Sequence, residues 1–185
     1  MFKNFLKKYG YYLVAIALVL VVGVAAGLSV NDSENLEPST PTGSTAVEMV
    51  CPMSSPEVIK WYSDTELFYN ATLKQWESHK AVDLTSNVSA DVFAVLDGVI
   101  TDCSYSYEDG YCLTISHEDG LTTTYCSLGK IDGLKNGDAV KQGQKIGQAS
   151  NTAANENLEG NHLHFSVCLN GKTVDPANYL TFENK

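Results

Sequence analysis

The 185-residue sequence contains no arginine, and its twelve basic residues are all lysines. Beyond residue 30, nine of these lysines stand against all 22 acidic residues, which gives that part of the chain a formal charge of −13. Proteins that bind nucleic acid need basic surfaces to neutralise phosphates. We therefore expect no nucleic-acid partner, and the charge favours a protein partner.

The chain also lacks any CxxC pair, so it offers neither a zinc ribbon nor a dithiol redox motif. Its cysteines are odd in number, so at least one is unpaired in a monomer: Cys51, Cys103, Cys112, Cys126 and Cys168. Cys112 and Cys126 flank a hairpin turn and could face each other across it. In a reducing habitat they would instead be small apolar residues, and we favour these buried free thiols.

Only one long apolar run is present, at residues 11–30 (YYLVAIALVLVVGVAAGLSV). About 20 such residues cross a hydrocarbon core of roughly 30 Å, which predicts a single-pass transmembrane helix. Lysines precede the run and acidic residues follow it, so residues 1–10 form a cytoplasmic tail and the rest lies outside the cell membrane. The alternative is a cleaved signal peptide, but the apolar part of a signal usually has only about 7 to 15 residues.

Residues 31–46 (NDSENLEPSTPTGSTA) contain almost nothing to bury, so we predict a flexible stalk there. The remaining residues, 47–185, have room for one domain. Short β-rich runs at 58–62 and 67–69 are typical of edge strands that lead into a sheet.

Further along, turn-forming Asp-Gly pairs separate three strand-like runs, at 92–100, 111–116 and 122–128. They predict an antiparallel meander. A polar loop at 151–161 precedes the alternating run 162–169 (HLHFSVCL), and Asn170-Gly171 is a strong hairpin turn. The predicted fold is all-β and antiparallel, with two sheets packed as a sandwich.

Histidine is scarce, and three of the four histidines lie in two short motifs, His79-Lys-Ala-Val-Asp83 and His162-Leu-His164. On an extended strand, His162 and His164 project to one side about 6.6 Å apart, and His79 and Asp83 can also converge. Two nitrogen ligands, one oxygen ligand and an open fourth position are typical of catalytic zinc, whose water can act as a nucleophile. The fourth histidine, His117, lacks a partner at ligand spacing, and we leave it out of the site.

These motifs resemble those of the lysostaphin-type (LytM) zinc endopeptidases of bacterial cell walls, whose signatures are HxxxD, Tyr-x-His-Leu and a C-terminal HxH. The resemblance covers roughly residues 54–180 and implies the LytM antiparallel β-fold. It also implies that His79, Asp83 and His164 bind Zn²⁺. By the same resemblance, His162 is a catalytic histidine that does not bind the metal but polarises substrate or handles protons.

Two positions depart from the family pattern. Ala81 stands where the family generally has glycine, which adds one methyl group beside the metal. Ser127, in Tyr125-Cys126-Ser127-Leu128, stands where the family has its second catalytic histidine. A serine hydroxyl does not titrate near neutral pH, and losing one such catalytic group typically costs about 10² to 10³ in rate. We therefore expect very weak hydrolytic activity or none.

The single anchor, the stalk and the degenerate catalytic position together resemble the sporulation members of this family. Those proteins project a LytM domain from the forespore membrane and pair with a mother-cell membrane protein of the stage III AH type in a channel-like complex. Two alternatives are open: an active peptidoglycan endopeptidase that uses zinc-bound water with His162, and an inactive regulator of another cell-wall hydrolase. Regulators of that kind more often lack the metal ligands, which are complete in this sequence.

Overall fold

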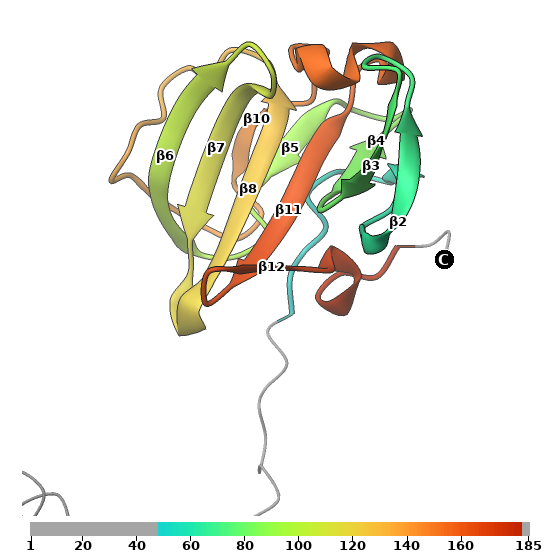
Figure 1. Cartoon of the computed structure of the whole chain (residues 1–185). Coiled ribbons are helices and arrows are strands. Elements are labelled where there is room, and N and C mark those ends of the chain that lie inside the picture. Colours follow the sequence, from blue (N-terminus) through green and yellow to red (C-terminus); the bar gives the residue numbers. More distant parts are fainter. Residues whose placement is uncertain (1–47, 183–185) are drawn as a thin grey trace, which may run out of the picture. The chain divides into compact units, whose positions relative to one another are not determined.

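The computed structural model describes residues 48–182 (Figure 1), so the predicted tail, membrane helix and stalk at residues 1–46 lie outside the described residues. Within residues 48–182, no helix is long and apolar enough to cross a membrane. The elements are twelve strands and three short 3-10 helices: β1 (Glu57–Lys60), β2 (Ser63–Asn70), β3 (Gln75–His79), β4 (Val82–Thr85), β5 (Asp91–Phe93), β6 (Gly98–Ser106), β7 (Gly110–Ser116), η1 (Glu118–Gly120), β8 (Leu121–Leu128), β9 (Ala139–Val140), β10 (Lys145–Gln148), η2 (Ala154–Glu159), β11 (Leu163–Leu169), β12 (Lys172–Val174) and η3 (Pro176–Asn178).

The main sheet has eight strands in the order β1-β4-β11-β8-β7-β6-β9, with β12 paired to β11. All of its pairings are antiparallel, and β6, β7 and β8 are consecutive neighbours, which confirms the predicted meander. The predicted Asn170-Gly171 turn joins β11 to β12. Both of its residues have positive φ, +49° and +79°, as a tight two-residue hairpin turn requires.

A second layer packs behind the main sheet (Figure 1) and consists of the two-stranded sheet β5–β10. It is much smaller than the second half of the predicted sandwich. Alternate residues of β7 and β11 are buried, so one face of the main sheet supplies most of the core. Tyr125 and Phe165 pack at 5.2 Å between ring centroids, and the Tyr125 hydroxyl accepts a hydrogen bond from the Val95 backbone at 3.0 Å. This hydrogen bond ties β8 to the segment between β5 and β6.

The predicted strand at 92–100 is wrong as a single element, because the chain leaves β5 at Phe93 and starts β6 only at Gly98. The Ala94 amide donates to the Gln144 carbonyl at 2.9 Å, and the Val95 amide donates to the Tyr125 hydroxyl. Neither hydrogen bond continues a β-ladder. Of the predicted edge strands, 58–62 corresponds to β1 at the edge of the main sheet. The run 67–69 lies in β2, which pairs only with β3 in a separate hairpin.

The prediction of free thiols is wrong for Cys112 and Cys126, which form a disulfide between β7 and β8. The register of the two strands pairs Leu113 with Tyr125 and Tyr111 with Leu128. The two cysteines therefore lie opposite each other, with their Cα atoms 4.2 Å apart. The other three cysteines, Cys51, Cys103 and Cys168, are free.

One row of residues runs across four strands of the main sheet and positions the candidate site. Asp83 on β4 lies opposite Lys60 on β1 and opposite His164 on β11, and His164 in turn lies opposite Cys126 on β8. Residues directly opposite each other in a ladder project to the same face of the sheet. The row therefore brings an ammonium, a carboxylate and an imidazole together on one face.

Candidate metal centre

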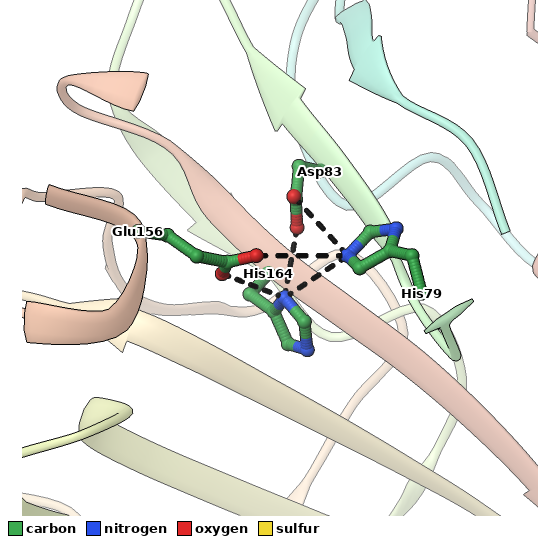
Figure 2. A group of neighbouring side chains, drawn as sticks. All are labelled: His79, Asp83, Glu156 and His164. Atoms are coloured by element: carbon green, nitrogen blue, oxygen red, sulfur yellow. Dashed lines mark hydrogen bonds and ion pairs between the residues drawn. The ribbon is translucent and has the colours of Figure 1, made fainter. Parts of the chain in front are cut away.

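The two short motifs meet where β3, β4 and β11 come together, and Figure 2 shows the side chains of His79, Asp83 and His164 pointing toward one another. His79 Nε2 lies 3.2 Å from Asp83 Oδ2 and 3.5 Å from His164 Nδ1. His164 Nδ1 lies 2.8 Å from Asp83 Oδ1. Ligand atoms about 2.0 to 2.1 Å from a tetrahedral zinc ion are about 3.3 Å apart. The three predicted ligands therefore have the spacing of a zinc site.

Hydrogen bonds to backbone carbonyls set the orientation of two histidine rings. His79 Nδ1 lies 3.0 Å from the Trp61 carbonyl oxygen, and His162 Nδ1 lies 2.9 Å from the Gly160 carbonyl oxygen. A carbonyl only accepts, so Nδ1 of each ring carries a proton and donates it. Nε2 is therefore the nitrogen that His79 turns toward the cluster.

His162 lies beside the cluster and is fully buried. It sits just before β11, in an isolated bridge to Ser150, so the predicted strand at 162–169 begins one residue later than expected. Its Nε2 is 3.5 Å from a carboxylate oxygen of Glu156. It also belongs, with Asp83 and Glu159, to a second group of possible metal ligands. That His162 is a catalytic histidine and not a ligand stays a prediction.

Glu156, which the sequence reasoning missed, supplies a fourth group to the cluster (Figure 2). It comes from η2, and its Oε2 lies 3.1 Å from His164 Nδ1 while its Oε1 lies 3.9 Å from His79 Nε2. The sequence predicted a fourth position open to water, but the structure puts a carboxylate beside it. Glu156 stands in the polar loop 151–161, and no motif or periodicity marks it there.

Lys60 was also missed, and it holds the carboxylates on one side of the cluster. Its Nζ is 2.8 Å from Glu156 Oε1 and 3.3 Å from Asp83 Oδ2, and it also contacts Glu159. Burial lowers the pKa of Lys60, but hydrogen bonds to Glu156 and Glu159 outweigh it and raise the pKa above its ordinary value. Lys60 is therefore a permanent cation in this cluster.

The charges in this cluster do not balance without a further cation. Three carboxylates, from Asp83, Glu156 and Glu159, face the single ammonium of Lys60, which leaves a formal charge of −2. Buried charges are stable only when they are paired or bind a metal ion. Within residues 48–182, Asp83 Oδ2 and His162 Nε2 are buried without a hydrogen bond. The residues present therefore fit a divalent cation.

The carboxylates around His164 favour a proton on its imidazole. Burial lowers the pKa of His164, but hydrogen bonds to Asp83 and Glu156 outweigh it and raise the pKa to about 10. Burial raises the pKa of Asp83, but the hydrogen bonds from His164 and His79 bring it well below its usual range. The cluster attracts positive charge strongly, and a metal ion would replace this proton.

Ser127 is buried and does not point its hydroxyl toward the four clustered side chains. Its Oγ donates to the Ser150 carbonyl at 2.9 Å, and the Ser150 hydroxyl donates back to the Ser127 carbonyl at 2.9 Å. Its backbone has φ of +56°. The hydroxyl thus links β8 to the loop between β10 and η2, and it supplies no group that titrates near neutral pH.

His117 lies outside the cluster, as predicted. Its Nδ1 is 2.8 Å from the Asp97 carbonyl oxygen, and its Nε2 is 2.7 Å from Thr123 Oγ1. Both ring nitrogens are therefore occupied within the meander of β6, β7 and β8.

Comparison with known proteins places this cluster in a family. Residues 77–176 match peptidase family M23, and this span includes every residue of the cluster except Lys60. The chain is 33% identical over 114 residues to stage II sporulation protein Q of Bacillus subtilis, which covers 60% of the chain and 38% of that protein. It is 38% identical over 98 residues to the peptidoglycan DD-endopeptidase ShyB of Vibrio cholerae, covering 52% of the chain and 22% of that protein. The matched region thus spans less than two fifths of each of these relatives.

Solved structures of related proteins also match this fold. The fold matches a chain of the SpoIIQ–SpoIIIAH pore-forming complex with a TM-score of 0.63 and 26% identity, covering 74% of this chain and 92% of that one. It matches the catalytic domain of lysostaphin from Staphylococcus simulans with a TM-score of 0.52 and 28% identity, covering 65% of this chain and 89% of that one. The family match covers residues 77–176, more than half of this chain, so the chain belongs to peptidase family M23.

Proposed function

We propose that this chain is a membrane-anchored, zinc-binding M23 domain with an impaired catalytic site, and that it acts in sporulation as a binding partner of a stage III AH-type membrane protein. In this role, residues 11–30 anchor it in the forespore membrane, and its C-terminal domain faces the mother cell as part of a channel-like complex. His79, Asp83 and His164 bind the zinc ion.

One observation carries this proposal, namely the match to SpoIIQ chains solved in complex with SpoIIIAH. The match extends over 92% of such a chain in one structure and 100% in another. The resemblance therefore covers almost all of the SpoIIQ domain present in those complexes. The replacement of a catalytic histidine by Ser127 points the same way, because a binding partner has no need of turnover.

When bound, zinc would supply a Lewis acid and hold strands β3, β4 and β11 together. The chain's own residues do the rest: Trp61 orients His79, Gly160 orients His162, and Lys60 stabilises the carboxylates. His162 keeps Nε2 as the ring nitrogen that no backbone carbonyl holds and that can exchange a proton. With Ser127 hydrogen-bonded to the backbone, however, the second imidazole that the family uses is missing.

The test is direct binding between the full chain, purified in detergent, and the extracytoplasmic domain of the stage III AH-type protein from the same genome. We expect a complex with a dissociation constant of about 1 μM or tighter, measured by calorimetry. The catalytic domain of lysostaphin serves as a control of the same fold that should not bind. If the full chain binds the stage III AH-type domain no more tightly than the lysostaphin domain does, the proposed partner is wrong.

A second function, an active peptidoglycan zinc endopeptidase, is favoured by the complete set of metal-binding residues and by the 38% identity to ShyB. Peptide release from purified peptidoglycan by the native chain, abolished in a His164→Ala variant, would establish it. We place it second because of Ser127.

A further inference from the structure

Glu156 is a buried residue, with 8% of its surface exposed, and its carboxylate contacts the cluster with both oxygens. Oε1 meets Lys60 at 2.8 Å, and Oε2 meets His164 at 3.1 Å and His162 at 3.5 Å. Removing a carboxylate from water costs several kcal/mol unless cations surround it. Lys60 pairs with Oε1, so the inward position leaves Oε2 facing the two histidines, where a cation could bind it.

The segment that carries Glu156 is fixed from two sides. On one side, backbone amides of η2 donate to the carbonyls of Tyr107 and Glu108, in the β6–β7 turn, at 3.2 Å each. On the other side, the Asn70 side chain donates to a carbonyl of η2 at 3.0 Å, and Thr72 Oγ1 accepts from an η2 amide at 3.1 Å. Glu156 is thus presented to the cluster by a preorganised loop that spans the site.

The spacing of the ligand atoms also suits a fourth ligand. One atom from each of His79, Asp83, Glu156 and His164 can be chosen so that all four lie within 4.8 Å of one another. The Glu156 Oε2 to His164 Nδ1 distance of 3.1 Å is close to the edge of about 3.3 Å that tetrahedral zinc requires. Lys60 occupies the other carboxylate oxygen, which leaves Oε2 turned toward His164 (Figure 2).

The charge balance supports the same arrangement. The charges of a dication and of the Asp83 and Glu156 carboxylates sum to zero. The charges of Lys60 and Glu159 also sum to zero. Both histidines can then be neutral ligands. A water molecule in the fourth position would compete with the Glu156 carboxylate for the space next to His164.

We propose that Glu156 is the fourth ligand of the bound metal ion, so that the site is closed by the chain itself. The proposal rests on the metal-binding part of the proposed function. It goes further because a closed four-ligand site is structural, whereas catalytic zinc keeps a position for water. Glu156 therefore blocks hydrolysis independently of Ser127.

The test uses the full chain in detergent, with the metal removed and replaced by Co²⁺, whose visible spectrum reports its ligands. Azide is then added as an external ligand. The native spectrum should stay unchanged on addition of azide, whereas the Glu156→Gln and Glu156→Ala spectra should shift. Competition with a chelating dye should show metal affinity at least about tenfold weaker in both variants.

Glu118→Gln is the control, because Glu118 lies in η1 and belongs to neither group of possible metal ligands. Its cobalt spectrum and azide response should match those of the native chain. Circular dichroism of each variant checks that the fold is intact, and Glu156→Gln keeps the side-chain volume.

Two results would overturn the inference: an azide-sensitive native spectrum, or equal metal affinity in the native chain and in Glu156→Gln. If either occurs while His164→Ala still abolishes metal binding, only the role of Glu156 is wrong. If the native chain binds no metal at all, the metal-binding part of the proposed function falls with it.

Discussion

At the scale of single residues, the two histidines of the His162-Leu-His164 motif turn different nitrogens toward Glu156. His164 uses Nδ1, because its place in the row opposite Asp83 brings that atom to 2.8 Å from the carboxylate. His162 uses Nε2, because its Nδ1 is held by the Gly160 carbonyl. Spacing two residues apart therefore predicts a shared site, but the partners of each ring decide which of its nitrogens faces that site.

His117 gives a prediction about stability and pH. Burial lowers its pKa below the ordinary imidazole value of 6.5, against a smaller opposing effect of its hydrogen bond to the Asp97 carbonyl. The unfolded chain therefore binds this proton more readily than the folded chain. We expect the free energy of unfolding to fall as the pH drops below about 6.5, until the lowered folded-state pKa is passed.

The measurement is urea denaturation between pH 7.5 and 5 for the native chain and for His117→Gln, which cannot titrate. The pH dependence should be shallower in His117→Gln, since the site histidines contribute equally to both proteins. Parallel curves for the two proteins would show that His117 keeps an ordinary pKa in the folded state.

At the scale of elements, the sequence predicted what depends on local pattern. The Asp-Gly and Asn-Gly turns and the alternation in β7, β8 and β11 are local, so the meander and the last hairpin could be predicted. Lys60 reaches the site because β1 pairs with β4. Glu156 reaches it because hydrogen bonds tie η2 to segments that are distant in the sequence. Such long-range register and loop contacts leave no periodic signal in one sequence.

The disulfide between β7 and β8 should stabilise the meander. It joins residues 14 positions apart, and closing a loop of that length restricts the unfolded chain by about 3 kcal/mol in the chain-entropy description. We expect the Cys112→Ala/Cys126→Ala double variant to lose about 2 to 4 kcal/mol in the free energy of unfolding.

Chemical denaturation with and without a reductant measures this loss. The double variant should show no effect of the reductant, whereas Cys168→Ser, which changes a free cysteine on β11 and keeps the disulfide, should respond to it as the native chain does. Equal unfolding midpoints for the native chain in both conditions would contradict a stabilising role for the bond.

At the scale of the whole molecule, the proposed function combines a peptidase fold and a metal site with two obstacles to catalysis. By this proposal, Ser127 stands where the family has an imidazole, and the Glu156 carboxylate takes the position where a catalytic zinc keeps its water. The obstacles lie on different elements, β8 and η2, so each can be removed separately. The formal charge of −13 beyond residue 30 also suits a protein partner better than an anionic wall polymer.

The measurement that tests the account most directly is zinc content together with peptidoglycan hydrolysis by the full chain. The comparison includes the native protein, Ser127→His, Ser127→His/Glu156→Gln and His164→Ala. We predict about one zinc ion per native chain and none in His164→Ala. Hydrolysis should be absent in the native protein and in Ser127→His, and should emerge only in the double variant. Zinc-dependent hydrolysis by the native chain would contradict the account and make the protein a working endopeptidase.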